Sequence, residues 1–573
     1  MIKKEKDSEL FSRFVVSGNH AKSDYLGLIN ELIVRGKRRD DIDEVYSLLL
    51  DEIITNKDKP VQTISFGTSG WRGKLGKDIF VKSVSQVTRA IVQMYEVVEE
   101  GSELAALLGV SSNEEAKKRG CVLGFDNRFG GELLAAQVGK VLVESGFQVY
   151  YAGESATGVL SAAVLQYKSA FSINLTPSHN PLDYGGYKFN GADGGPAASA
   201  VTEQITANAR SIVEADNRAK VEPLWNITQL LADKNVQQLD SLGCWKELVQ
   251  QGGDVHGLSL KTSVDKFLER TDIFVAVDCV HGASRLHIKS IFNNSDSEKL
   301  HILRDLPDVT FGGVAPEPSS ANMEQIVSLL GERDERLKLG AIIDPDGDRI
   351  RFTDGETEIS MNQFGAMAYH FLHEEKHKKG MVAKTVATSN LANSLAAAFD
   401  EELFEPSVGF KNFKPVIGKA LVIFEESDGI SIIGHTPEKD AYIGLLLALE
   451  MLLVTDINLG QYLEKIESQY GAYYPDRDGV VVAIQGDELL EKLVLLEKYG
   501  AGAEVKVGEK YMKIDHVISI DGRKMVMEDG SWLMIRPSGT EPKVRFYVES
   551  RTSTGTAELV RAAKGMLKEI GLL

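Results

Sequence analysis

The spacing of hydrophobic and polar positions divides the chain into regions. Within residues 1–60, apolar residues recur three and four positions apart in SELFSRFVVSG and DYLGLINELIVRG, a spacing typical of amphipathic helices. From residue 61, short apolar runs alternate with helix-like segments, as in CVLGFD, GELLAAQVGKVLVESG and FQVYYAG. The pattern therefore predicts a helical N-terminal extension followed by units of alternating strands and helices.

The strand–helix alternation returns twice. A second unit runs from DIFVAVDCVHGA (272–283) to LKLGAIIDPDGDR (337–349), and a third from MVAKTVATSN (381–390) to LVIFEESDG (421–429). The units share a layout and no visible sequence repeat. Such alternation indicates mixed or parallel sheets covered by helices on both faces.

The last hundred or so residues follow another pattern. Short β runs such as WLMIRP and VRFYVES surround helix-like segments, which favours an α+β domain. Because 573 residues are too many for one core, we expect several domains. The predicted divisions are 1–60, 61–225, 226–350, 351–472 and 473–573.

Charge and composition exclude some classes of protein. A formal net charge of −19 argues against nucleic acid as a partner, because binding it requires a basic surface. Three cysteines far apart argue against a disulfide framework, and Cys121 and Cys279 are expected to be buried. The most apolar segment, residues 441–454, is too short to cross a bilayer and contains Glu450, which predicts a buried helix. With no apolar stretch in MIKKEKDSEL, we expect a cytoplasmic protein without a membrane partner.

The segment LTPSHNPLDYGGYKFN, residues 175–190, carries the first candidate chemistry. Its prolines, Asn180 and paired glycines are good turn residues. An ordinary loop does not explain why Ser178 and His179 stand together at its tip, with Lys188 shortly after. The segment is therefore a candidate site for a reactive hydroxyl.

The segment DPDGDR, residues 344–349, is a candidate metal site. Asp344, Asp346 and Asp348 alternate and, if extended, would point to one face. Three converging carboxylates suit a hard cation such as Mg²⁺. An EF-hand is excluded, because Arg349 and Gly355 occupy its glycine and glutamate positions. A solvated acidic turn, or a phosphatase with an aspartyl nucleophile, stays open from this loop alone.

The segment RPSGTEPKVR, residues 536–545, combines groups that bind phosphate. Arg536 offers a planar fork for phosphate oxygens. Ser538 and Thr540 add hydroxyls, and Gly539 lets backbone N–H groups approach an anion. FEESDG (424–429) and FGTSGWRG are weaker signals, since acidic and glycine-rich turns are common.

Together, FGTSGWRG, TPSHNP, DPDGDR, EES and RPSGTEP occur in the order found in the α-D-phosphohexomutase family, which the chain resembles from about residue 61 onward. TPSHNPLDYGGYKFNGADGGPA and VGFK (408–411) are especially similar to glucose-specific bacterial phosphoglucomutases, and phosphomannomutases are close rivals. The resemblance implies four domains around a central cleft: three related α/β mixed-sheet domains and a smaller C-terminal α+β domain. In chain order these would carry the phosphoserine, metal-binding, sugar-binding and phosphate-binding loops.

The resemblance also implies roles for individual residues. Ser178 would carry a phosphoryl group, and its phosphate would join the three aspartates as a Mg²⁺ ligand. The remaining roles are catalytic for Arg72, His179, Lys188 and Arg349, and substrate binding for Lys411, Glu425, Ser427, Arg536, Ser538, Gly539 and Thr540. Two departures concern the sugar loop: Ile423 and Phe424 stand where the family usually has paired glycines, and His435 lies later than expected.

The implied function is a phosphoglucomutase. It would interconvert glucose 1-phosphate and glucose 6-phosphate through phosphoserine and a glucose 1,6-bisphosphate intermediate, which also serves as activator. Phosphomannomutase, dual specificity and a Mg²⁺-dependent sugar phosphatase are the alternatives. Lys188 is the first candidate for the general base, because a desolvated lysine among cations loses its proton more readily, and His179 is the second. Whether the chain forms a homo-oligomer is left open.

Overall fold

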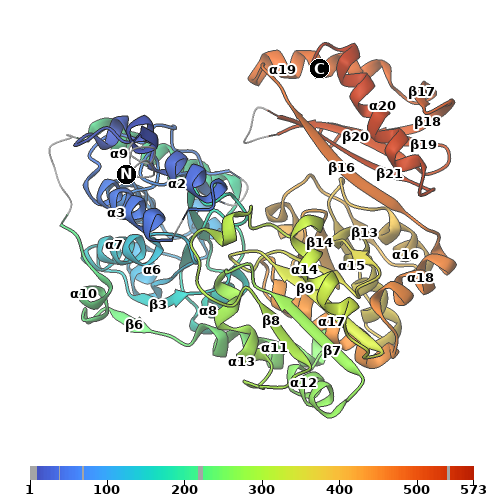
Figure 1. Cartoon of the computed structure of the whole chain (residues 1–573), viewed down its shortest axis with the longest axis horizontal. Helices are drawn as coiled ribbons and strands as arrows, with labels where there is room; N and C mark the ends of the chain where they lie inside the picture. Colours follow the sequence, from blue (N-terminus) through green and yellow to red (C-terminus); the bar gives the residue numbers. More distant parts are fainter. Residues whose placement is uncertain (1–8, 38, 68–69, 217–222, 539–542) are drawn as a thin grey trace.

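The computed structural model describes residues 9–37, 39–67, 70–216, 223–538 and 543–573. Its strands form four sheets that follow one another along the chain, from the blue N-terminal end to the red C-terminal end (Figure 1). Gly539 and Thr540, expected in the phosphate-binding loop, lie outside the described residues.

The first sheet has six strands in the order β1-β5-β4-β2-β3-β6. The strands are β1 (Trp71–Lys74), β2 (Cys121–Phe125), β3 (Val149–Glu154), β4 (Phe171–Leu175), β5 (Tyr184–Asn190) and β6 (Val236–Gln238). Strands β4, β2, β3 and β6 are parallel, and β5 and β1 are antiparallel to their neighbours. Because β6 comes from beyond residue 225, we propose that the first domain extends past that position.

Helices cover both faces of the first sheet. They are α4 (Val81–Glu96), α7 (Gly131–Glu144), α8 (Thr157–Tyr167) and α9 (Ser199–Ala215). In β2, Leu123 packs in the cluster that contains Leu134 of α7, whereas its neighbour Val122 packs with Leu160 of α8. Adjacent strand residues point to opposite faces. Strand β2 is therefore buried along its whole length.

The second and third sheets are smaller. The second, in the order β11-β10-β9-β7-β8, contains β7 (Ile273–Asp278), β8 (Leu300–Leu303), β9 (Leu337–Ile343), β10 (Ile350–Thr353) and β11 (Glu358–Ile359). The third, in the order β13-β12-β14-β15, contains β12 (Val382–Lys384), β13 (Leu403–Phe404), β14 (Val422–Glu425) and β15 (Gly429–Ile432).

One strand order recurs in these three sheets. Numbered within each unit, the order is second, first, third, fourth: β3-β2-β4-β5, β8-β7-β9-β10 and β13-β12-β14-β15. The fourth strand is antiparallel to the third each time. The connection from the third strand to the fourth is therefore structurally equivalent in the three units. The first connection contains Ser178 and the second the three aspartates, and the EES segment runs from the end of β14 into the third.

The fourth sheet is antiparallel throughout, in the order β16-β21-β20-β19-β18-β17. It is formed by β16 (Tyr474–Val481), β17 (Glu504–Val507), β18 (Lys510–Ile518), β19 (Arg523–Met527), β20 (Trp532–Pro537) and β21 (Lys543–Ser550). Helix α20 (Gly555–Glu569) packs against it, and α19 (Gly486–Val494) precedes β17. Three mixed α/β sheets followed by an α+β unit confirm the predicted fold class.

Further helices connect or cover these sheets. They are α2 (Tyr25–Val34), α3 (Arg39–Thr55), α5 (Glu103–Leu108), α6 (Asn113–Arg119), α10 (Ile227–Leu231), α11 (Ser241–His256), α12 (Leu260–Glu269), α13 (Ile288–Ile291), α14 (Ser320–Gly331), α15 (Met361–His370), α16 (Leu391–Phe399), α17 (Ala441–Thr455) and α18 (Leu459–Tyr470). Residues 9–14 are helical and are followed by α2 and α3, as the N-terminal pattern predicts.

The apolar segment near residue 441 is the buried helix α17, as predicted. Its Glu450 accepts hydrogen bonds from the Ser259 N–H at 2.9 Å and the Ser263 hydroxyl at 2.8 Å, so this buried carboxylate is paired. Across the described ranges, no single helix combines the length and apolarity needed to span a membrane; only α17 and α18 together reach them, bent by 77°. Cys121 and Cys279 are buried, as expected, and so is Cys244.

Candidate active site

Ser178 lies in the connection between β4 and β5, with an unusual backbone conformation. Its φ is +58°, a left-handed value that a non-glycine residue adopts only when its surroundings impose it. The hydroxyl is buried and donates to Asp344 Oδ2 at 2.9 Å. Gly186 allows this loop to fold back, because a Cβ there would lie 2.2 Å from the Thr176 carbonyl oxygen. The structure thus joins the candidate hydroxyl to the aspartate segment of another domain.

Two residues that the sequence analysis missed hold this loop. The Arg128 guanidinium donates to the carbonyl oxygens of Ser178, at 2.7 Å, Asn180 and Pro181. Asp126 accepts the Thr176 hydroxyl at 2.6 Å and lies 3.6 Å from Arg128. Burial raises the pKa of Asp126 to about 7. Both residues follow β2 in the sequence FDNRF. Polar residues directly after a buried strand are the sequence pattern from which they could have been proposed as functional.

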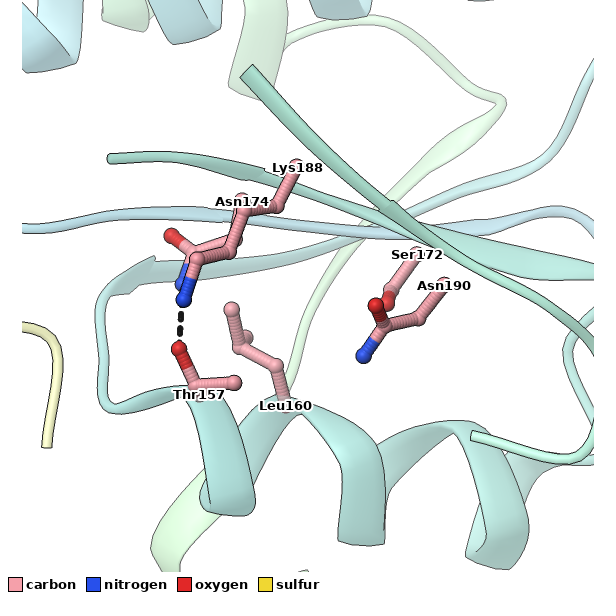
Figure 2. A pocket seen from close by; sticks show the side chains of 6 residues that line it. All are labelled: Thr157, Leu160, Ser172, Asn174, Lys188 and Asn190. Atoms are coloured by element: carbon pink, nitrogen blue, oxygen red, sulfur yellow. Dashed lines mark hydrogen bonds between the residues drawn. The ribbon is translucent and has the colours of Figure 1, made fainter. Parts of the chain in front are cut away.

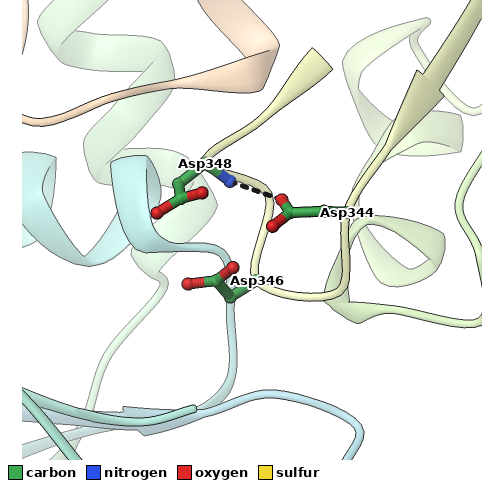
Figure 3. Close-up of side chains that lie close together, drawn as sticks. All are labelled: Asp344, Asp346 and Asp348. Atoms are coloured by element: carbon green, nitrogen blue, oxygen red, sulfur yellow. Dashed lines mark hydrogen bonds between the residues drawn. The ribbon is translucent and has the colours of Figure 1, made fainter. Parts of the chain in front are cut away.

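The three aspartates converge in a turn between β9 and β10 (Figure 3). The segment is not extended: Gly347, with φ +63°, turns the chain, and the backbone N–H groups of Asp348 and Arg349 each donate to Asp344 Oδ1 at 3.0 Å. Carboxylate oxygens of the three residues lie within 4.8 Å of one another. Turn geometry, rather than strand alternation, therefore brings them together.

The aspartate cluster fits a divalent cation. All three side chains are buried, and the pKa of Asp344 is raised by burial and by the neighbouring charges of Asp346 and Asp348. Within the described residues, Asp346 Oδ1 and Asp348 Oδ1 are buried and accept no hydrogen bond. A buried carboxylate oxygen that accepts no hydrogen bond is costly unless a cation binds it. Hard oxygen donors of this kind suit Mg²⁺.

Helix α8 of the first domain holds one of these aspartates. Thr157, at its start, donates its hydroxyl to Asp346 Oδ2 at 2.8 Å and its N–H to the Asp346 carbonyl oxygen at 2.7 Å. Asn174 of β4 donates in turn to the Thr157 hydroxyl oxygen at 3.1 Å (Figure 2). These contacts cross from the first domain to the second, and no local sequence pattern signals them.

Lys188 has surroundings that the sequence argument did not anticipate. Its ammonium lies 2.5 Å from Asp346 Oδ2 and 2.7 Å from Asp348 Oδ2. Burial lowers the pKa of Lys188, but these two carboxylates outweigh it and raise the pKa above its ordinary value. The premise of a lysine among cations is therefore wrong here. A small cavity of about 10 Å³ is lined by Lys188, Asn174 and residues of α8 (Figure 2).

His179, in contrast, is the group that lies among cations. Its Nδ1 is 3.3 Å from Ser178 Oγ. Burial, together with the positive charges of Arg349 and Arg72, holds the pKa of His179 well below its usual range. Arg72 itself donates to Asn180 Oδ1 at 2.8 Å, and within the described residues Arg349 Nε is buried without an acceptor. The neutral imidazole therefore faces the hydroxyl.

The sugar-loop candidates lie at the third equivalent connection: Glu425 ends β14, and Ser427 lies between β14 and β15. Ser427 donates to Glu425 Oε1 at 2.6 Å, and burial raises the pKa of Glu425. Lys439, missed from the sequence, lies 3.2 Å from Asp348 Oδ2. Burial lowers the pKa of Lys439, but the charges of Asp348, Glu438 and Glu425 outweigh it and raise the pKa. This lysine links the metal loop to the sugar loop.

The two departures in the sugar loop have structural explanations. Ile423 and Phe424 are buried strand residues, and the Phe424 ring fills the space that a side chain at Gly365 would occupy. His435 Nε2 lies 2.6 Å from Asp440 Oδ2, and Asp440 caps the start of α17. His435 therefore supports a helix terminus in this structure.

The remaining candidates lie at contacts of their own. Lys411 donates to Ser199 Oγ on α9 at 3.0 Å. Arg536, at the end of β20, donates to Asp521 Oδ1 at 3.0 Å, and the Ser538 N–H donates to the Lys543 carbonyl oxygen at 2.8 Å. No contact among the described residues joins Lys411, Arg536 or Ser538 to the Ser178–aspartate cluster.

Family models for phosphoglucomutase/phosphomannomutase match four successive parts of the chain. They are α/β/α domain I at residues 63–216, domain II at 256–357, domain III at 360–470 and the C-terminal domain at 496–564. The chain belongs to this family, the α-D-phosphohexomutases. Its members are isomerases that act as intramolecular phosphotransferases, and so the chain is an enzyme of this class.

Curated relatives of this phosphohexomutase carry three different substrate names. It is 24% identical to phosphoglucomutase 1 of Drosophila melanogaster over 86% of this chain and 91% of that protein. A probable phosphoglucosamine mutase of Methanosphaera stadtmanae is 24% identical, covering 88% and 98%. A phosphomannomutase of Mycoplasma pneumoniae is 25% identical, covering 84% and 87%. The relatives therefore leave the hexose undecided.

Solved structures share the fold of this phosphohexomutase. A putative phosphomannomutase from Thermus thermophilus superposes with a TM-score of 0.69 at 23% identity, covering 88% of this chain and 99% of that one. The open form of the Paramecium phosphoprotein parafusin superposes with a TM-score of 0.66 at 20% identity, covering 90% and 96%.

Proposed function

We propose that this phosphohexomutase is a phosphoglucomutase that interconverts glucose 1-phosphate and glucose 6-phosphate. Phosphorylated Ser178 would give its phosphoryl group to the free hydroxyl of the sugar phosphate, and the hydroxyl proton would pass to a base. The resulting glucose 1,6-bisphosphate would turn in the cleft and return its other phosphoryl group to Ser178. The observation that carries this proposal is the Ser178 hydroxyl, buried 2.9 Å from Asp344 on a left-handed backbone.

Asp344, Asp346 and Asp348 would hold Mg²⁺ together with the phosphate on Ser178. The two oxygens of Asp346 and Asp348 that accept no hydrogen bond from any described residue support this assignment. A related mutase structure, the N-acetylphosphoglucosamine mutase of Aspergillus fumigatus, is a complex with GlcNAc-6P and magnesium. When bound, the ion would supply a Lewis acid for the charge on the transferring phosphoryl group.

The other residues would position substrate and neutralise its charge. Arg72 and Arg349 would face the transferring phosphoryl group, whose equatorial oxygens carry the developing charge. Glu425 and Ser427 would bind sugar hydroxyls in both orientations of the bisphosphate. Lys411, Arg536, Ser538, Gly539 and Thr540 complete the proposed substrate contacts. Local cations of this kind concentrate an anionic substrate on a chain of net charge −19.

The proton carrier is either His179 or Lys188. His179 Nδ1 lies 3.3 Å from the Ser178 hydroxyl, whereas the Lys188 ammonium contacts two carboxylates. This geometry supports His179 over Lys188 as the proposed proton carrier. If it carries the proton, His179→Gln will lower kcat by about 10²-fold, the usual size of a proton-transfer contribution, with magnesium binding retained. Near-normal kcat in that variant, with a large loss in Lys188→Met, would assign the role to Lys188.

Mass spectrometry of the purified protein tests the proposed function most directly. A phosphate on Ser178 is expected, together with turnover of glucose 1-phosphate in the presence of the bisphosphate and Mg²⁺. Release of inorganic phosphate without isomerisation would indicate the phosphatase alternative. Because relatives are named for glucose, mannose and glucosamine phosphates, kcat/KM on all three 1-phosphates decides the hexose.

A further inference from the structure

The N-terminal helices, which the family models do not cover, are built into the first domain. Leu28 and Ile29 of α2 and Leu49 of α3 pack in the same apolar cluster as Val84 of α4. The buried Glu52 carboxylate forms an ion pair with Lys77, which follows β1. These helices are therefore packed into the apolar core of the first domain and do not form a separate extension.

The same helices also contact the second domain. Arg39 of α3 donates to Asp308 Oδ1 at 2.9 Å. Asp308 further accepts the backbone N–H groups of Thr310, at 2.9 Å, and Gly312, at 3.1 Å, which folds residues 308–313 into a compact turn. Gly313 lies so close to α2 that a Cβ there would be 2.6 Å from Ile33 Cγ2. The N-terminal helices thus hold a turn of the second domain against the first.

Phe311 stands at the tip of that turn. Its side chain is fully buried in the first domain's cluster, and its φ of +52° is left-handed. The ring centroid lies 4.7 Å from the guanidinium carbon of Arg128, a cation–π distance. The guanidinium that holds the Ser178 loop is thereby covered by a ring from the other domain.

Helix α3 also supports Arg128, through a contact with Phe129, the next residue in the chain. The Tyr46 ring packs against Phe129 with 4.5 Å between centroids. Arg128 is 6% exposed, so its bonds to the carbonyl oxygens of the Ser178 loop form away from water. Hydrogen bonds are stronger in such low-dielectric surroundings. These bonds oppose the strain of the left-handed conformation at Ser178.

We propose that the N-terminal helices and Phe311 are positioning elements of the reaction. They keep the Arg128 side chain buried and away from water. Arg128 in turn holds the Ser178 loop in the conformation that places the hydroxyl against the aspartate cluster. The proposal rests on the proposed role of Ser178. Phe311 and Tyr46 touch neither Ser178 nor the aspartates by any contact the structure gives among described residues, and so they act through Arg128 and Phe129.

The test replaces the ring and keeps an apolar side chain. In Phe311→Leu, kcat for glucose 1-phosphate is expected to fall about tenfold, because a displaced nucleophile reacts more slowly. KM should stay within about twofold, since no substrate contact is removed. Phe147→Leu is the matched control: this fully buried ring belongs to the same cluster but packs against Tyr95 and Phe171. It should lower the unfolding temperature and leave kcat unchanged.

A second pair of variants separates position from stability. Tyr46→Phe keeps the ring and removes a buried hydroxyl that has no partner among the described residues, so kcat should be retained. Tyr46→Leu loses the ring contact with Phe129, and kcat should fall by about threefold at unchanged KM. An unchanged kcat in Phe311→Leu, or an equal loss of kcat in Phe147→Leu, overturns the proposal.

Measurements on the wild-type protein distinguish failure of the proposed function from failure of the positioning proposal. If it carries phosphate on Ser178 and isomerises glucose 1-phosphate, the proposed function stands and the variants test positioning alone. If it does neither, the proposed function fails before the variants are measured.

Discussion

The connections β4–β5 and β9–β10 occupy equivalent places in two domains but are stabilised differently. The β4–β5 loop presents Ser178 on a strained, left-handed backbone and is held by the Arg128 side chain through carbonyl oxygens. The β9–β10 loop turns at Gly347, and its own N–H groups bind Asp344. The backbone of the first loop is held by a distant side chain, whereas the turn of the second is also closed by its own N–H groups.

The two loops also meet. Ser178 donates to Asp344, and Thr157, at the start of α8 in the first domain, donates to Asp346. The aspartate cluster of the second domain is therefore held in part by the first domain. The repeated strand order provides the same connection in each unit, and the loop sequence decides whether it carries the hydroxyl, the three aspartates or the EES segment's acidic residue and serine.

The strongest effects should separate the two loops by function. Ser178→Ala should lower turnover by at least about 10⁴-fold, because the proposed mechanism has no other phosphoryl carrier. Magnesium binding, measured by calorimetry, should survive in this variant. Asp346→Ala should abolish both turnover and magnesium binding. Turnover at the parental rate in Ser178→Ala would contradict the proposed mechanism.

Weaker effects concern the support of each loop. Thr157→Val keeps the shape of the side chain and removes its hydrogen bond to Asp346, so magnesium affinity should fall about 10- to 100-fold. Thr176→Val is the matched variant in the other loop, where it removes the acceptor for the Ser178 N–H and the donor to Asp126. It should lower kcat and leave magnesium affinity unchanged. Equal losses of affinity in both variants would show that the two supports are not separate.

The weakest effect is the pH dependence of the first loop's support. Asp126 has a folded pKa of about 7, above its unfolded value, so the folded state binds the extra proton between those two values. The stability it contributes is complete below the unfolded pKa and is lost as pH rises towards 7. Asp126→Asn does not titrate, and relative to wild type its unfolding temperature should therefore rise between about pH 4 and pH 7 and stay level above that. A difference independent of pH would show that Asp126 is ionised throughout. Thr157→Val, which alters the support of the β9–β10 loop, should show no such change in unfolding temperature with pH relative to wild type.

The sequence predicted the fold class correctly, and its candidate loops stay predictions. Apolar runs and their spacing indicate three α/β units and an α+β domain because burial on one or two faces fixes those periods. DPDGDR predicts a metal site from residue chemistry alone. The sequence could not predict that Thr157 and Arg128 support these loops. These contacts depend on how α8 and β2 pack, which no local pattern encodes.

Lys188 shows where reasoning from sequence fails. Its neighbours in the chain do not include the carboxylates that surround it, since Asp346 and Asp348 lie on another domain. The kinds of chemical group and the secondary structure that carries them could be read from the chain, because both depend on residue type and local spacing. Which groups meet was settled by the packing of the domains, because a buried charge takes its properties from neighbours that the fold brings together over more than a hundred residues.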